Sequence, residues 1–247
     1  MINKQSVLVY DIETRPILAY VWGLKDQNIG LNQIVKDWSV MAWGAKWLGE
    51  PASKTMYMDT RKRSEREILG ALWVLLNRAD IVITQNGQNF DSPKLNARFI
   101  QYGMIPPKPY RHLDTYQIIK RAAQFTSNKL EYLTDKLCTK YKKLSHSKYP
   151  GMALWTECLN GNNDAWEEMK KYNIHDVLST EELYNRIRAW APQNAPKVYL
   201  EPTVCSVCGS KHTERRGYDT SKKGKYPKIH CLDCGRWTVG DRIKESK

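Results

Sequence analysis

Long apolar runs are missing from this chain of 247 residues. No apolar stretch approaches the ~20 residues that a helix needs to span a bilayer, so we expect no membrane partner. Internal repeats and low-complexity tracts are also missing. The first strand-like run begins near residue 6, which leaves no room for a signal peptide. We therefore expect a soluble, cytoplasmic protein, and a hydrophobic content of 41% is enough to build a core.

Cysteine is scarce, with six residues in the chain. Cys138 and Cys158 stand alone, and we interpret them as ordinary buried or half-buried thiols in a reducing compartment. The other four form two CxxC pairs with 22 residues between them: Cys205, Cys208, Cys231 and Cys234. Four thiolates in two such turns are typical of a tetrahedral Zn²⁺ site. We expect one structural zinc ion in a zinc ribbon, with two disulfides or a redox pair as the disfavoured alternatives.

Acidic residues are outnumbered by basic ones, 26 to 39, which gives a formal net charge of +13. Residues 192–247 hold 12 Lys/Arg and 6 Asp/Glu, a net +6, and the remaining +7 lies in residues 1–191. This balance suits a polyanionic substrate, although a high pI also simply aids solubility. Residues 120–148 hold 8 Lys/Arg and 2 acids, which fits a nucleic-acid backbone or a solvated helix face equally well.

The acids that are present follow strand-like runs. Residues 7–14 are apolar and β-branched, and they end in Asp11 and Glu13. Side chains two apart in a strand share a face, so these carboxylates point the same way. Such a pair in a buried strand is stable mainly with a cation between its members, and oxygen ligands suit Mg²⁺ or Mn²⁺. A strand end with a solvated acidic turn would give the same local pattern.

Two further positions carry acids in similar settings. Asp91 follows a β-branched run and begins a helical stretch, at the strand end where open α/β sheets place their sites. A plain helix N-cap is the alternative for Asp91. Tyr172 and Asp176 lie four residues apart in the helical pattern over 164–190, so they share one helix face. That face would be functional or merely a solvated polar face.

These residues form an ordered set: Asp11-x-Glu13, Asn86-x-x-x-Phe90-Asp91 and Tyr172-x-x-x-Asp176. The set resembles the three motifs of the DEDD superfamily of 3′→5′ exonucleases, over about residues 6–190. With its tyrosine, the last motif resembles that of the DEDDy branch, which includes the proofreading domains of family B DNA polymerases. The histidine branch does not fit, because Lys171 stands where its histidine would be.

Pattern alone predicts an α/β protein with a mixed sheet, and the resemblance implies a ribonuclease H-like five-stranded sheet flanked by helices. We expect strands at 6–13, 38–48, 54–58, 80–85 and 110–114. We expect helices at 61–77, with Ser64 as a candidate cap, and at 91–102, 115–124, 129–141 and 164–190. A loop with a possible short helix is expected over 16–33. Asp114 is expected to be a helix cap or a residue that supports the site. The expected domains are an exonuclease domain (1–191), a proline-containing linker (192–202) and a small four-cysteine zinc-ribbon domain (203–247).

The resemblance also implies a stand-alone 3′→5′ exonuclease that releases nucleoside 5′-monophosphates by two-metal-ion hydrolysis. Asp11, Glu13, Asp91 and Asp176 would hold two Mg²⁺ or Mn²⁺ ions. Tyr172 would position the attacking water, because a phenol of pKa ~10 is a poor base at neutral pH.

The expected substrate is DNA with a free 3′ end. The expected nucleic-acid contacts are Asn86, Lys142, Lys143, Arg215, Arg216, Lys222 and Lys223. The zinc ribbon would bind nucleic acid or a replication or repair protein. Two alternatives stay open at this point: an exoribonuclease, and a non-catalytic zinc-ribbon protein that only binds nucleic acid.

Overall fold

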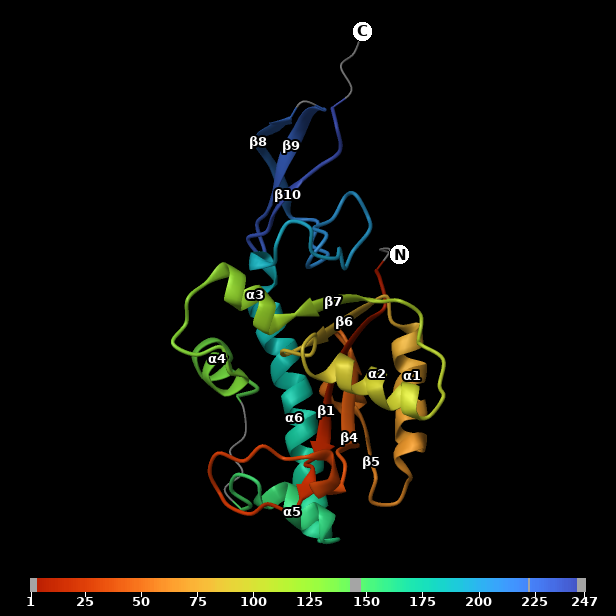
Figure 1. The fold of residues 1–247 in the computed structure, drawn as a ribbon. Helices are drawn as coiled ribbons and strands as arrows, with labels where there is room; N and C mark the ends of the chain where they lie inside the picture. Colours follow the sequence, from red (N-terminus) through yellow and green to blue (C-terminus); the bar gives the residue numbers. More distant parts are fainter. Residues whose placement is uncertain (1–3, 143–147, 222, 244–247) are drawn as a thin grey trace.

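A five-stranded sheet forms the centre of the larger part of the chain (Figure 1). The computed structural model describes residues 4–142, 148–221 and 223–243. The strands are β5 (Met56–Asp59), β4 (Ser39–Trp47), β1 (Val7–Arg15), β6 (Ile81–Thr84) and β7 (Arg111–Asp114), in that spatial order. β1, β4 and β5 pair antiparallel, whereas β6 and β7 run parallel to β1. The mixed sheet expected from the sequence is therefore confirmed.

Helices cover both faces of this sheet, and the alternation of side chains along β1 decides which face each residue joins. Val7 and Val9 join a core with α3 (Thr115–Ala122), α4 (Leu130–Leu137) and α6 (Asn163–Ile187). Leu8 and Tyr10 join the opposite core with α1 (Glu65–Arg78) and α2 (Asp91–Gln101). Because Asp11 and Glu13 continue the Val7–Val9 series, they belong to the face that α6 covers (Figure 1).

Most predicted elements are present, with boundaries displaced by a few residues. α1 begins after Ser64 as expected, since Ser64 and Glu67 form a reciprocal capping box. The predicted end of the helix over 129–141 is wrong, because α4 ends at Leu137. The long helix also ends early, at Ile187, and a 3₁₀ turn follows over Arg188–Trp190. None of the described helices is both long and apolar enough to cross a membrane.

Several short elements were not predicted. The expected loop over 16–33 contains β2 (Leu18–Ala19), which pairs with β3 (Ile34–Lys36) just after the loop. The possible short helix is a 3₁₀ turn over Leu31–Gln33. A helix α5 (Ala153–Leu159) packs against α6, and a 3₁₀ turn occupies Ala52–Lys54. All are one or two turns or a few strand residues long, too short for hydrophobic periodicity to reveal.

The distance between α6 and the sheet is set by a glycine. Gly44 in β4 lies opposite Asp11 in β1. A Cβ at Gly44 would lie 2.4 Å from Asn173 Oδ1 and 3.1 Å from a Val177 methyl carbon. The missing side chain therefore lets α6 come close to the strand pair at the level of Asp11.

The C-terminal part forms a three-stranded sheet at the far end of the molecule (Figure 1). Its strands are β8 (Thr213–Ser221), β9 (Gly224–Cys231) and β10 (Trp237–Val239), in the order β10-β9-β8. The predicted linker before it packs on the first domain. Val198 is fully buried in the core that contains Val7, and its carbonyl accepts a 3.0 Å hydrogen bond from the Gln5 amide.

Arg236 joins the two parts. Its guanidinium is buried and donates hydrogen bonds to the carbonyls of Ala189, Ala191 and Pro192, just beyond the end of α6. A cation suits this position because carbonyl dipoles gather at a helix C-terminus. Arg236 lies two residues after Cys234, so the cysteine-rich turn is held directly against the end of α6.

We expect Gly44→Ala to lower the free energy of unfolding by about 1–3 kcal/mol, because the added methyl overlaps Asn173. Gly70→Ala is the matched control, since a Cβ at this α1 glycine meets no atom within 4 Å. Replacing this helical glycine should stabilise the protein by about 0.5–1 kcal/mol. Urea denaturation measures both, and equal changes in the two variants would contradict the packing role of Gly44.

Arg236→Met should lower the free energy of unfolding by about 1–3 kcal/mol, because it leaves buried carbonyls without donors. Arg216→Met is the control, because the Arg216 side chain is 66% exposed, and we expect a change within about 0.5 kcal/mol. Chemical denaturation gives the energies. Limited proteolysis between residues 192 and 204 should be faster in Arg236→Met alone, and identical cleavage rates would argue against the contact.

Candidate active site

The carboxyl end of β1 and the middle of α6 bring together the first and third acidic motifs. Asn173 Nδ2 donates a 2.8 Å hydrogen bond to Asp11 Oδ2, which ties α6 to the strand. On the same helix, Tyr172 and Asp176 are 8% and 4% exposed. The helix face shared by these two residues is therefore buried against the sheet, and the alternative of a solvated face is wrong.

Asp91 connects the second motif to the first. It is the first residue of α2, but Phe90 holds the N-cap position, so the alternative interpretation as a plain N-cap is wrong. Instead, Asp91 Oδ1 accepts a 3.1 Å hydrogen bond from the amide of Ile12, the residue between Asp11 and Glu13. A hydrogen bond between residues 79 positions apart in the chain thus places Asp91 beside the two acids of β1.

Burial perturbs the titratable groups at this end of the sheet. It raises the pKa of Asp91 to about 7, with a smaller contribution from the Asp114 charge, and the Ile12 amide opposes the rise. The pKa of Tyr172 is also raised, first by burial and then by the charges of Asp176, Glu13 and Asp11. The Tyr172 phenol is therefore close enough to acids of both β1 and α6 for their charges to raise its pKa, and it stays neutral at physiological pH.

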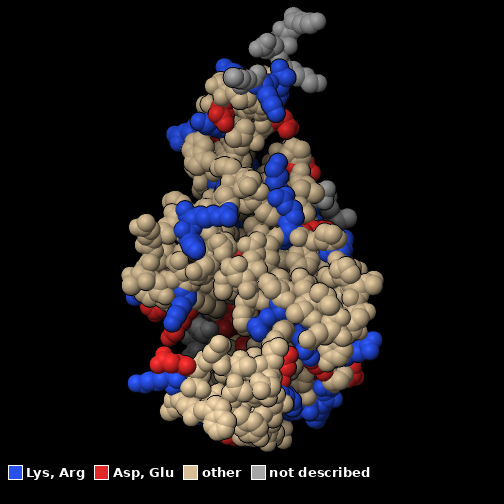
Figure 2. All heavy atoms as spheres, in the orientation of Figure 1, with Lys and Arg blue, Asp and Glu red and all other residues tan. Residues whose placement is uncertain are grey.

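The donor chemistry and the burial of these acids suit a divalent cation. Glu13, Asp91 and Asp176 are each less than 10% exposed, and Asp11 is half-buried. Buried carboxylates of like charge are costly unless a cation neutralises them, and oxygen donors suit Mg²⁺ or Mn²⁺. Figure 2 shows a hollow on this face of the molecule, with acidic side chains inside it and Lys and Arg side chains along its edges.

A turn anchored by Asp114 positions the segment that leads to Asp91. Asp114 Oδ1 accepts from the amides of Asn86 and Tyr116, both at 2.9 Å, and Oδ2 accepts from the Gln88 amide at 3.0 Å. Asp114 is thus both the cap of α3, as predicted, and a support for the turn. Asn86 has a positive φ of 63°, which asparagine tolerates better than most residues, so it shapes this turn.

Two residues that support the acids were not predicted from the sequence. Asn173 holds Asp11, and Gly44 makes room for Asn173. The available signal in the sequence was an uncharged polar residue beside Tyr172 in the helical pattern. Such a residue needs a hydrogen-bond partner when it is buried, and Asn173 is fully buried. The partner itself was not visible, because Asp11 is 162 positions away in the chain.

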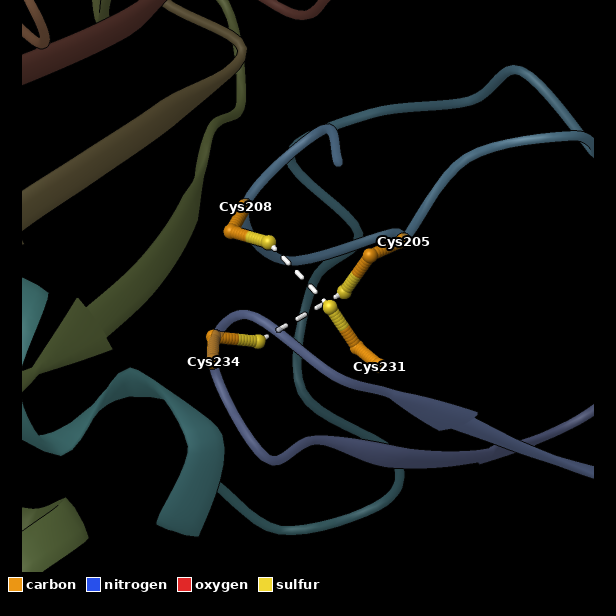
Figure 3. Close-up of side chains that lie close together, drawn as sticks. All are labelled: Cys205, Cys208, Cys231 and Cys234. Atoms are coloured by element: carbon orange, nitrogen blue, oxygen red, sulfur yellow. Dashed lines mark hydrogen bonds between the residues drawn. The ribbon is translucent and has the colours of Figure 1, made fainter. Parts of the chain in front are cut away.

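The four cysteines form the second candidate site (Figure 3). Their sulfurs lie within 4.8 Å of one another, with 3.7 Å between Cys205 and Cys234 and 3.6 Å between Cys208 and Cys231. A tetrahedron with Zn–S bonds of about 2.3 Å has edges of about 3.8 Å. The cluster therefore fits one zinc ion. Within the part of the chain that the structure describes, no other group of three or more His, Cys, Asp or Glu is as compact.

The two CxxC turns have the same geometry. Gly209 and Gly235 follow the second cysteine of each pair, both with φ of 78°, and their amides bond to the carbonyls of Cys205 and Cys231. Only glycine adopts this conformation without strain. Backbone amides then point at the sulfurs, and two of them, with the nearby thiols, lower the pKa of Cys231 against the effect of burial.

The two nearby histidines are engaged elsewhere. His212 Nδ1 lies 3.1 Å from Asp233 Oδ1. The His230 ring stacks on Trp237 with centroids 4.4 Å apart. The four-cysteine set is therefore complete without either ring.

Apart from Asn86, which lies in the turn before α2, the described predicted nucleic-acid contacts fall in two separate regions. Lys142 is exposed near α6, and its carbonyl bonds to His175 Nε2. Arg215, Arg216 and Lys223 are exposed on the β8–β9 hairpin, far from the acids. Lys143 and Lys222 lie outside the described residues. The structure thus leaves the described basic side chains accessible to a ligand, and their contacts with nucleic acid stay a prediction.

In metal-free protein, the Asp91 carboxyl should make stability depend on pH. Its pKa is about 7 in the folded protein and ~3.9 when unfolded, so the folded state binds more protons between these values. The free energy of unfolding should therefore fall as pH rises from about 4 to about 7, by up to about 4 kcal/mol. Asp91→Asn should lack this part of the fall.

The measurement is urea denaturation of both proteins in EDTA at pH 5 and pH 8. The difference in unfolding free energy between wild type and Asp91→Asn should shift with pH in favour of the variant. Adding Mg²⁺ should reduce this shift, because a bound cation stabilises the ionised carboxylate. Parallel pH profiles in EDTA would show that the carboxyl is not desolvated.

Comparisons with known proteins identify the fold of this chain. A search of curated proteins by sequence finds no match. Among solved structures, the family B DNA polymerase from the hyperthermophilic archaeon Pyrobaculum calidifontis is similar, with a TM-score of 0.55 and 14% identity. The match covers 75% of this chain and 25% of the polymerase chain, so it concerns the fold alone. A family model described as RNase_H superfamily matches residues 40–188, which confirms the expected ribonuclease H-like fold. The chain belongs to the RNase H superfamily.

Proposed function

We propose that this protein is a metal-dependent 3′→5′ exonuclease that acts on DNA and releases nucleoside 5′-monophosphates. The observation that carries the proposal is the convergence of three distant motifs at one end of the sheet. Asp91 bonds to the backbone between Asp11 and Glu13, and Tyr172 senses Asp176 together with the β1 acids. The RNase H superfamily fold supports nuclease chemistry, and the similar fold of a DNA polymerase favours DNA over RNA.

In this proposal Asp11, Glu13, Asp91 and Asp176 hold two Mg²⁺ or Mn²⁺ ions. Such ions, when bound, lower the pKa of water and neutralise charge that develops on the phosphate. Asn173 orients the Asp11 carboxylate, and the Ile12 amide orients that of Asp91. Tyr172 keeps its proton, because burial and neighbouring acids raise its pKa, so it positions the attacking water by a hydrogen bond rather than as a base.

The zinc ribbon has a separate role in this proposal. Cys205, Cys208, Cys231 and Cys234 hold one Zn²⁺ that shapes the base of the β8–β9 hairpin. Arg215, Arg216 and Lys223 on that hairpin then contact a nucleic-acid backbone or a replication or repair protein. We further propose the division into an exonuclease domain (1–191), a connecting segment (192–202) and a ribbon (203–247).

The test is cleavage of 5′-labelled single-stranded DNA, duplex DNA and single-stranded RNA, each with Mg²⁺, Mn²⁺ or EDTA. We expect DNA products shortened stepwise from the 3′ end, lost with EDTA and in Asp11→Ala/Glu13→Ala. Tyr172→Phe should lower kcat by about 10- to 100-fold with a smaller effect on KM, because water is less well positioned. Gly70→Ala is the control and should retain kcat, because Gly70 lies in α1 on the opposite face of the sheet from the acids.

Each alternative has its own outcome. Cleavage of RNA in preference to DNA would make the protein an exoribonuclease. Binding of nucleic acid without cleavage of any substrate would assign the function to the zinc ribbon and remove the nuclease proposal.

A further inference from the structure

An exposed apolar segment, which we call the arm, spans residues 16–36 between β1 and β4. Nine large hydrophobic side chains are exposed on it: Ile17, Leu18, Tyr20, Val21, Trp22, Leu24, Ile29, Leu31 and Val35. Trp22 and Leu24 are 97% and 99% exposed, and Tyr20 is 77% exposed. Contiguous apolar exposure on this scale marks an interaction site in a folded protein.

The arm is held in place by its own hydrogen bonds. β2 and β3 pair along it, and the Tyr20 amide donates to the Gln33 carbonyl at 2.9 Å. Gln33 Nε2 donates back to the Tyr20 carbonyl at 2.9 Å, and Gln33 Oε1 accepts from the Gly30 amide at 2.8 Å. The backbone is therefore fixed at Tyr20, two residues before Trp22.

The arm begins beside the candidate active site. It leaves the sheet after Arg15 and returns at Ser39, and these two residues pair with each other. Glu13 pairs with Ala42 in the same ladder, two residues before Arg15, a separation of about 7 Å along a strand. In Figure 1 the arm is the red-orange loop that leaves the end of β1 near α5.

A cavity at the base of the arm links it to Tyr172. The cavity has a volume of about 340 Å³ and is lined by Thr14, Pro16, Gly151, Met152 and Trp155. It is a shallow depression that opens to the surface. The Trp155 ring also packs edge-on against Tyr172, with centroids 6.2 Å apart. Trp155 therefore lies between the base of the arm and the residue proposed to position water.

We propose that the arm binds the unpaired bases of the nucleic-acid strand whose end lies at the acids, an inference that rests on the proposed function. Aromatic faces stack on any base, and the exposed Lys25 and Lys36 provide positive charge for the phosphates. Tyr20 and Trp22 are the residues whose rings stack on the bases. A paired base already has both faces stacked, so the arm selects single-stranded over duplex substrate.

Binding is measured separately from cleavage. Fluorescence anisotropy of a labelled 15-nucleotide single strand, in Ca²⁺ and without Mg²⁺ or Mn²⁺, compares wild type with Trp22→Ala and Trp22→Phe. Trp22→Ala should raise Kd by about 5- to 100-fold, and Trp22→Phe should restore most of the affinity. The matched control is Trp190→Ala, because Trp190 is 71% exposed outside the arm and should leave Kd within twofold of wild type.

Two further readouts separate this inference from the nuclease proposal. Affinity for a blunt duplex should be equal in wild type and Trp22→Ala. The p-nitrophenyl ester of thymidine 5′-monophosphate, which has no second base, should be hydrolysed equally by both. Wild type that binds through Trp22 but cleaves nothing would remove the nuclease proposal and keep the arm. Equal Kd values for Trp22→Ala and Trp190→Ala would overturn the arm's role in base binding and point to a protein partner.

Discussion

The burial of like-charged carboxylates at one end of a sheet is the constraint on which the rest of the structure depends. Glu13, Asp91 and Asp176 are nearly inaccessible to water, and an apolar environment disfavours their ionised forms. The effect is visible in the raised pKa of Asp91. Such an arrangement costs stability in the folded protein unless a cation is present. It therefore persists where the charge is needed for chemistry, as expected at a metal-dependent site.

The packing around these acids holds them against their mutual repulsion. Gly44 allows α6 to approach β4, and Asn173 then reaches Asp11 from that helix. Just beyond its C-terminal end, the chain that follows α6 is held by Arg236 of the C-terminal part. One long helix thus carries Tyr172 and Asp176 and is fixed at its middle and just past its C-terminus. The position of the third motif therefore depends on contacts with three separate parts of the chain.

The two sites differ in how local their geometry is. Each CxxC turn is built within a few residues, by a glycine of positive φ and by amides that point at sulfur. The acidic site has no comparable local structure, because its carboxylates come from three different elements. This difference explains why the cysteine spacing alone was specific. Each acid alone had a plain local alternative, and only the ordered set of three motifs indicated a nuclease-like site.

The sequence by itself determined the strands and helices with long periodic patterns, the shared face of Asp11 and Glu13, the cap at Ser64 and the two cysteine turns. All of these depend on interactions between residues close together in the chain. Only the tertiary structure decided the partner of Asp91, the support that Asn173 and Gly44 give to Asp11, and the contact of Arg236 with the end of α6. It also decided the exposure of Trp22. Apolar residues are buried where another part of the fold offers a surface to pack against, and the described part of the fold offers no such surface to the Trp22 side chain.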